Sequence, residues 1–177
     1  MQKLLLHSCC GPCSTAVLER LADQFSVTLF FHNPNILPEA EYQRRLEAQQ
    51  IAADHFAPQG VRLRVPPYEP NVFLAVTAGL EAEAEGGARC TQCFALRLEA
   101  TAQAAKDGGF DLFTSTLSVS PHKNAARLNE IGIATEVKYG IPYLPADFKK
   151  QDGYRRSITL AAELGLYRQK YCGCVFV

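Results

Sequence analysis

The sequence predicts an α/β fold in which a parallel sheet carries helices on both faces. Two observations favour this fold. Short runs of apolar and β-branched residues alternate with longer segments whose apolar residues recur at helical spacing. Strands that alternate with helices of this length form βαβ units, and such units build a parallel sheet. The length of 177 residues fits one domain over residues 1–177.

The elements of the first half follow from their apolar spacing. Lys3–Ser8, Val27–His32 and Val61–Val65 are predicted strands, because they are short and rich in Val, Leu and Phe. Pro12–Gln24 and Glu39–Phe56 are predicted helices. Proline is favoured in the first turn of a helix, which supports the start of the earlier one.

The second half repeats this alternation. Its predicted elements are, in order, a short helix at Asn71–Leu80, an acidic loop at Glu81–Gly87, a helix from Cys93 to Lys106, a strand at Phe110–Thr114, a helix from Pro121 towards Ile131, a fifth strand at Ala134–Tyr139 and a last helix at Tyr154–Leu164. Gly108 and Gly165 follow two of these helices, and glycine is favoured at helix ends.

Charge and hydropathy exclude several classes of protein. The 18 basic and 18 acidic residues cancel, so binding to nucleic acid by bulk charge is not expected, although a local basic face stays open. No apolar run approaches the roughly 18 residues of a membrane span. The apolar run Leu4–Leu6 is too short for the core of a signal peptide. We therefore expect a cytoplasmic protein without a membrane partner.

Seven cysteines in three tight groups are the main functional signal. An odd number of cysteines in a chain without an export signal does not fit a plain disulfide framework. Core cysteines chosen for packing would be scattered along the chain. Grouped cysteines in a reducing compartment indicate metal binding or redox chemistry.

The first group, Cys9, Cys10 and Cys13, joins the first strand to the first helix. Ligand sites of parallel sheets lie in such loops, and the positive end of the helix dipole favours thiolates. Cys10-Gly11-Pro12-Cys13 alone is similar to the redox motif of thioredoxin. The proline segment that would complete a thioredoxin site, Gly140-Ile141-Pro142, comes too late in the chain for that fold.

The second and third groups suggest a metal centre and a redox pair. Cys90 and Cys93 have the two-residue spacing that lets both sulfurs face one metal, and together with the first group they could supply four thiolates. Four thiolates fit zinc or a [4Fe–4S] cluster, and the spacing leaves both open. Cys172-Gly173-Cys174 would close a small, strained disulfide, the easily reduced kind.

The tail also offers a surface for nucleic acid. Basic residues outnumber acidic ones between Asp147 and Lys170, with tyrosines interleaved, which is typical of a solvated face but also of a surface that binds nucleic acid. Among the histidines, His7 and His32 are expected in the core, whereas His122 begins a helix where it could contact a substrate.

Five motifs in order carry a family resemblance: Leu6–Cys13 (LHSCCGPC), Gly87–Cys93 (GARCTQC), Phe113–Lys123 (FTSTLSVSPHK), Asp147–Tyr154 (DFKKQDGY) and Tyr167–Cys174 (YRQKYCGC). Together they resemble the epoxyqueuosine reductase family of the QueH type over nearly the whole chain. The resemblance implies a [4Fe–4S] enzyme that removes the epoxide oxygen of epoxyqueuosine at the tRNA wobble position. It also implies a Rossmann-like, adenine-nucleotide-hydrolase (HUP-like) sheet.

The resemblance further implies roles for the cysteines. Cys9, Cys10, Cys90 and Cys93 correspond to the cluster ligands, and Cys172 and Cys174 to a redox-active disulfide. Relatives with aspartate at the position of Cys13 are associated with a second iron, so Cys13 leaves a second iron open here. An unidentified electron donor must supply two electrons, and His122, Asp152 and Tyr154 are candidates for the acid that protonates the departing oxygen.

Two other functions remain open from the sequence. A zinc-stabilised RNA-binding module would use the first two cysteine groups but has no need of Cys172-Gly173-Cys174. An ATP-dependent tRNA thiolase of the same fold would need a glycine-rich phosphate loop. Gly11 is the only glycine in the loop after the first strand, so we expect no ATP.

Overall fold

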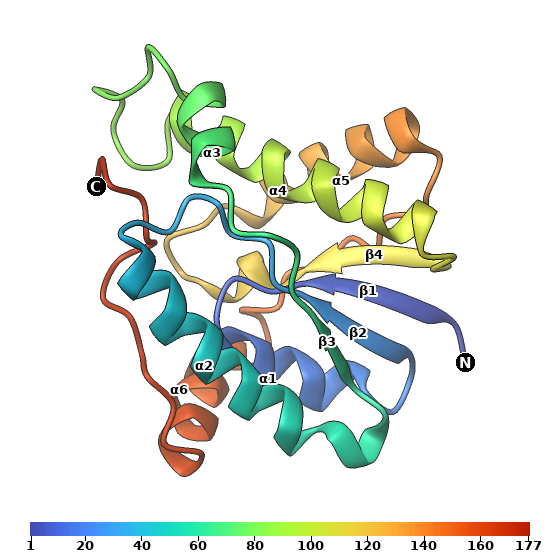
Figure 1. Ribbon diagram of the computed structural model, residues 1–177. Coiled ribbons are helices and arrows are strands. Elements are labelled where there is room, and N and C mark those ends of the chain that lie inside the picture. Colours follow the sequence, from blue (N-terminus) through green and yellow to red (C-terminus); the bar gives the residue numbers. More distant parts are fainter.

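The computed structural model describes residues 1–177 and has a four-stranded parallel sheet between two layers of helices (Figure 1). The strands are β1 (Lys3–His7), β2 (Ser26–Phe30), β3 (Arg62–Arg64) and β4 (Leu112–Ser115), in the order β3-β2-β1-β4. Every pairing is parallel. The predicted α/β fold class is confirmed.

The helices divide between the two faces of the sheet (Figure 1). One face carries α1 (Gly11–Leu21), α2 (Glu39–His55) and α6 (Gly153–Glu163), and the other α3 (Pro70–Val76), α4 (Ala88–Asp107) and α5 (Ala125–Tyr139). Two short 3-10 helices, Ala57–Gln59 and Thr116–Val119, complete the set. None of the helices is long and apolar enough to cross a membrane.

Alternate side chains of β1 supply the two halves of the core. Leu4 and Leu6 pack with Val17 of α1, whereas Leu5 packs with Leu98 of α4. All five side chains are fully buried. Successive residues of a strand point to opposite faces, so one apolar run is enough to hold both helical layers.

The predicted fifth strand at residues 134–139 is wrong, because these residues end α5. Leu128, Gly132 and Thr135 are its buried positions, at helical spacing, while Val137 is 82% exposed. The helix predicted from Pro121 begins instead at Ala125, since the Asn124 side chain accepts a hydrogen bond from the amide of Arg127. Tertiary packing and this cap outweigh the β-branched residues that suggested a strand.

A short fifth pairing lies just after α5. The amide of Phe113 donates to the carbonyl of Pro142 at 3.0 Å, and the amide of Leu144 donates to the carbonyl of Phe113 at 2.9 Å. Tyr143 thus forms a single parallel bridge with β4. Strand-like pairing at this edge exists, but it is one residue long and is displaced from the predicted range.

The topology places the loop after β1 at a switch point of the sheet. β2 lies on one side of β1 and β4 on the other, so the loops that follow β1 and β4 open a crevice at the carboxyl edge. The amide of Cys9 donates to the hydroxyl of Thr116 at 3.3 Å, which joins the two loops. The first cysteine group therefore lies where parallel sheets bind ligands.

Candidate functional site

Three thiols converge at the start of α1. The sulfurs of Cys9, Cys10 and Cys13 all lie within 4.8 Å of one another, and those of Cys9 and Cys10 are 3.8 Å apart. Cys10 is the N-cap residue, and its carbonyl accepts from the Ser14 hydroxyl at 2.8 Å. This thiol triad has the donor set and the spacing to hold a metal ion.

Hydrogen bonds among the triad concentrate negative charge on one sulfur. Hydrogen bonds with Cys10 and Cys13 hold the pKa of Cys9 well below the usual value, against the effect of burial, and Lys123 adds to the lowering. Cys13 lowers the pKa of Cys10, but the bond to Cys9 and burial outweigh this and raise it to about 12. The bonds that Cys13 makes to Cys10 and Cys9, with burial, raise its own pKa.

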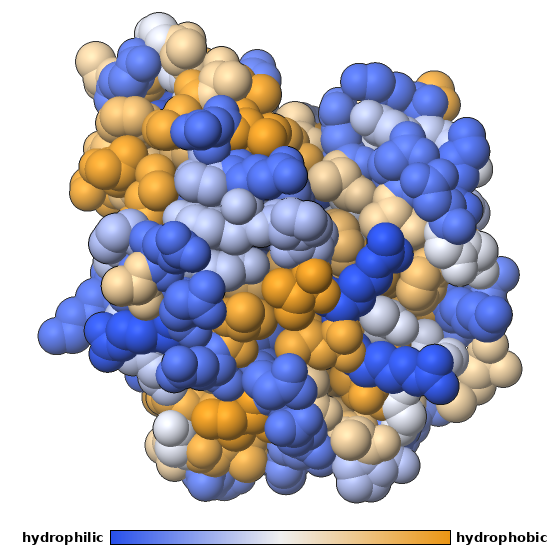
Figure 2. Space-filling model, in the orientation of Figure 1, coloured by the Kyte–Doolittle hydropathy of each residue, from blue (hydrophilic) through white to orange (hydrophobic).

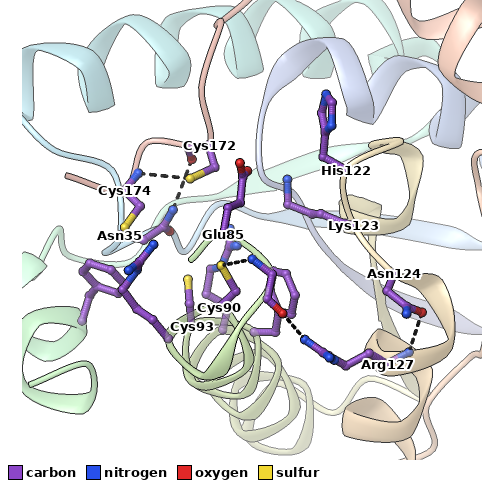
Figure 3. A pocket seen from close by; sticks show the side chains of 15 residues that line it. Asn35, Glu85, Cys90, Cys93, His122, Lys123, Asn124, Arg127, Cys172 and Cys174 are labelled. Atoms are coloured by element: carbon purple, nitrogen blue, oxygen red, sulfur yellow. Dashed lines mark hydrogen bonds between the residues drawn. The ribbon is translucent and has the colours of Figure 1, made fainter. Parts of the chain in front are cut away.

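The other four cysteines line a neighbouring cavity of about 150 Å³ (Figure 3). Cys90 and Cys93 lie in the first turns of α4, which begins at Ala88 rather than at the predicted Cys93. The amide of Gly86 donates to the Cys90 sulfur at 3.2 Å. Cys174 packs with Cys93 through Phe73 of α3, and Cys172 lies against the same group. The fold therefore brings the second and third cysteine groups together.

Phe73 lies on the buried face of α3, which is an amphipathic helix. Its ring is fully buried, while Val72, Leu74 and Val76 of α3 are 36–38% exposed. Figure 2 shows apolar surface gathered at the upper left, where α3 lies in Figure 1. The ring centroids of Phe73 and Phe176 lie 6.4 Å apart, so the C-terminal tail leans on the buried side of α3.

A larger cavity of about 470 Å³ lies over the thiol triad. It shares four residues with the smaller cavity: Glu85, His122, Lys123 and Cys172. Cys9 and Cys90 also pack against the same apolar cluster of Phe94, Leu117 and Leu128. The two cavities thus adjoin, and Cys172 stands between the triad and the Cys90–Cys93 pair.

The tail forms one wall of the larger cavity. Its contributing residues are Arg168, Gln169, Lys170, Tyr171, Cys172 and Val177. Val175 and Val177 remain 55% and 53% exposed, so of the apolar end only Phe176 packs inward. The wall is basic and aromatic on the side that faces the thiol triad.

Buried groups of α2 and the preceding loop fix this tail. The Arg45 guanidinium donates to the carbonyls of Tyr171 at 2.9 Å and Cys172 at 3.0 Å. Asn35 donates to the same Cys172 carbonyl at 3.3 Å. Gly173 has a φ of 102°, and its carbonyl accepts from the amide of Leu37 at 3.0 Å.

The pair Cys172 and Cys174 consists of free thiols with opposite acidities. A hydrogen bond from the Cys174 thiol lowers the pKa of Cys172 to about 6, in spite of burial, and the Cys174 amide, Lys123 and Arg97 add to it. The same bond to Cys172, together with burial, raises the pKa of Cys174 far above its usual value. Cys172 is thus the more nucleophilic sulfur at neutral pH.

The candidate acids occupy different places. His122 lines both cavities, and Tyr154, at 39% exposure, lines the larger one. Asp152 lies on the exposed turn before α6 with a φ of 58° and is not among the residues that line either cavity. His7 is a core histidine as expected, with its ring nitrogens on Ser115 and on the His32 carbonyl.

Sequence reasoning missed the buried cations of the site. Arg97 and Arg89 are 3% and 1% exposed and line the smaller cavity with Lys123. Their signal in the sequence is the spacing Arg89, Cys93, Arg97, which repeats every four residues along one helix face. Arg45 gave no such signal, because its partners lie 126 and 127 residues further along the chain.

Gly11 has a packing role. A Cβ there would lie 2.7 Å from the carbonyl oxygen of Ala48, so glycine lets α1 approach α2. The one glycine of the loop after β1 is therefore explained by helix packing.

Comparisons with known proteins agree on one family. The family model described as epoxyqueuosine reductase QueH matches residues 4–177. The epoxyqueuosine reductase QueH of Staphylococcus epidermidis is 46% identical over 179 residues, which cover 98% of this chain and 75% of that protein. That of Streptococcus pyogenes is 47% identical over 176 residues, which cover 98% of this chain and 69% of the relative.

A solved structure supports the fold. A predicted subunit of a tRNA methyltransferase from Methanocaldococcus jannaschii superposes with a TM-score of 0.55 at 15% identity. The match covers 92% of this chain and 75% of that one. At this identity the likeness concerns the α/β architecture alone.

Proposed function

The chain belongs to the epoxyqueuosine reductase QueH family, and from this premise we propose that it removes the epoxide oxygen of epoxyqueuosine in tRNA to give queuosine. The single observation that carries the proposal is the position of Cys172, which lines both the cavity over the thiol triad and the cavity of Cys90 and Cys93. A structural zinc site would have no use for a redox pair at that junction, whereas an oxidoreductase would.

The donor set fits an iron–sulfur centre. Cys9, Cys10, Cys90 and Cys93 would hold a [4Fe–4S] cluster, which supplies electrons one at a time. Thiolate ligands suit iron–sulfur clusters, and the buried Arg89 and Arg97 beside them suit a negatively charged group. Cys13, the third member of the triad, remains near the centre as a free thiol or as a ligand to a second iron.

The overall reaction sets what the side chains must do. Conversion of an epoxide to an alkene breaks two C–O bonds, forms one C=C bond and releases the oxygen as water. It consumes two electrons and two protons. Oxidation of the two thiols of Cys172 and Cys174 to a disulfide releases two electrons and two protons, so this pair balances one turnover. An external donor then reduces the disulfide.

The larger cavity would receive the modified base. Its 470 Å³ volume lies between the thiol triad and the tail wall. His122 and Tyr154 line it and are the groups placed to give a proton to the departing oxygen. Asp152, outside the lining, is left without a role in this proposal.

The tail would also contact the tRNA backbone. Arg168 and Lys170 line the mouth of the larger cavity and are exposed. Cationic side chains at the entrance of a base pocket bind phosphates without reading sequence. We expect these two residues to raise affinity for tRNA without entering the chemistry.

Activity of tail variants tests the proposal. Anaerobic protein with a chemical reductant is given tRNA that carries epoxyqueuosine, and the nucleosides are analysed by mass for loss of one oxygen atom. The wild-type chain should form queuosine, whereas Cys172→Ser should form almost none while keeping its iron. Thr159→Ala, on the exposed side of α6, serves as the control with full activity. Unchanged turnover by Cys172→Ser would contradict the role of the pair.

A further inference from the structure

Two buried arginines flank a cysteine on one face of α4. Arg89, Cys93 and Arg97 follow each other at intervals of four residues and are 1%, 7% and 3% exposed. All three line the smaller cavity, into which the side chains of Cys90, Cys93, Cys172 and Cys174 project (Figure 3). Residues four apart share a helix face, so the helix itself fixes the cations beside the thiols.

Neither arginine has a carboxylate partner. Arg97 donates from one terminal nitrogen to the side-chain oxygen of Asn33 at 3.2 Å, and its Nε has no partner. Arg89 donates from one terminal nitrogen to the carbonyls of Leu80, Glu81 and Glu83, and its Nε is also unpartnered. The ion pairs of the protein include neither residue.

The cavity around them is short of negative charge. Arg89, Arg97, Lys123 and Arg127 line it, and Glu85, which is exposed, is the only carboxylate. An arginine stays protonated in a protein, and a buried charge without a counter-charge is strongly disfavoured. The remaining groups that can become negative there are the cysteines.

We propose that the positive charge of Arg97, supported by that of Arg89, balances the negative charge of a centre held by these cysteine thiolates. Arg97 thereby sets how readily that centre accepts an electron. The inference rests on the proposed function, because it requires a cluster on these cysteines. Reduction adds one negative charge within the cavity. A fixed positive charge favours the reduced state, so it raises the midpoint potential. Arg97 acts here as a positioning residue that tunes the centre.

The test separates the effect of the charge at position 97 from the effect of the size of the side chain there. Arg97→Gln keeps a polar side chain but removes the charge, whereas Arg97→Lys keeps the charge. Lys106→Gln, on the exposed last turn of the same helix, is the matched control. After anaerobic cluster assembly, iron and sulfide are determined and the midpoint potential is measured by redox titration with a spectroscopic readout. Circular dichroism verifies the fold of each variant.

We expect a more negative midpoint potential in Arg97→Gln, a smaller shift in Arg97→Lys and none in Lys106→Gln. If Arg97→Gln folds but takes up no cluster, restored uptake in Arg97→Lys supports the counter-charge role. Unchanged potential in Arg97→Gln, or equal behaviour of the Gln and Lys variants, overturns it. A wild-type protein that assembles no cluster would instead refute the proposed function, so the two failures are distinguishable.

Discussion

The guanidinium of Arg45 donates to the carbonyl oxygen of Cys172 at 3.0 Å, although the two residues are 127 positions apart. Arg45 is 2% exposed, and its Nε donates to Glu41 at 2.8 Å. Glu41 in turn accepts from the hydroxyl of Tyr167 at 2.9 Å. A helix of the first half therefore fixes the C-terminal segment that carries Cys172 and Cys174.

Arg45→Met should destabilise the protein strongly. The substitution leaves Glu41 buried without its close ion-pair partner and the Tyr171 carbonyl without its Arg45 donor, and loss of one partner of a buried pair costs about 3–5 kcal/mol. Chemical denaturation measures the change. Arg44→Met is the control, because Arg44 is exposed and its nearest contact to Glu41 is 3.9 Å, so it should cost under about 1 kcal/mol. Equal losses in the two variants would contradict the role of Arg45.

Gly173→Ala should displace the tail. At a φ of 102° an L side chain is strained, and its Cβ would lie 2.9 Å from Ile36 Cγ1 and 3.0 Å from a terminal nitrogen of Arg45. We expect a loss of about 1–3 kcal/mol in unfolding free energy and a marked fall in turnover. Gly79→Ala separates strain from crowding, since Gly79 has a φ of 85° but nothing within 4 Å of its Cβ. A cost no larger than that of Gly79→Ala would mean that the tail is not held at Gly173.

Within the C-terminal pair, alkylation of the metal-free, reduced protein should favour Cys172 over Cys174. Its rate with iodoacetamide should rise with pH through about 6, where the thiolate forms, while Cys174 stays unreactive. Cys174→Ala removes the largest cause of the lowered pKa and should move the midpoint upwards. Cys174→Ser keeps a donor and should move it less. Mass spectrometry of the C-terminal peptide measures the alkylation of Cys172 at each pH. An identical midpoint in all three proteins would contradict the role of Cys174 in lowering the pKa of Cys172.

Stability should fall as the pH drops below neutrality. Burial, with Arg97 nearby, lowers the pKa of His7 to about 3 and that of His32 to about 4, so the folded protein keeps both rings neutral. The unfolded chain binds these protons near pH 6.5, so unfolding becomes easier from about pH 6.5 down to about 4. For His32 alone the loss is at most about 3 kcal/mol.

Substitution isolates the histidine contribution. His32→Gln should flatten part of the slope of unfolding free energy against pH, measured by denaturation of the metal-free protein between pH 7 and about 4. His55→Gln, at an exposed position on α2, should leave the slope intact. A slope that is the same in both variants would show that His32 is not held neutral by the fold.

Much of the fold was predictable because its pattern is local. The apolar run of β1 and the periodic positions of α1 and α4 give the alternation of strand and helix directly. The helical state of the segment 134–139 was not predictable, since its β-branched residues Thr135 and Val137 favour a strand. The Asn124 cap and packing of α5 on α4 decide the outcome, and the packing is a tertiary effect.

The cysteines of the site could be predicted from the sequence, whereas the arginines that hold or surround them could not. Cysteines carry their chemistry in the residue type, so the spacing of the three groups is enough to indicate a redox or metal site. The hydrogen bonds of Arg45 and the placement of Arg97 depend on which helix faces which loop. Sequence spacing indicates the face that Arg97 shares with Cys93, but it gives no information on what lies opposite.

The iron and acid-labile sulfide content of protein prepared without oxygen tests the proposed iron–sulfur centre most directly. We expect about four of each per chain in the wild type and in Cys172→Ser. Both iron and sulfide should be lost in Cys10→Ser and Cys93→Ser, with the fold retained. Zinc in place of iron with no sulfide, or a cluster that survives in Cys93→Ser but disappears in Cys172→Ser, would contradict the proposed centre.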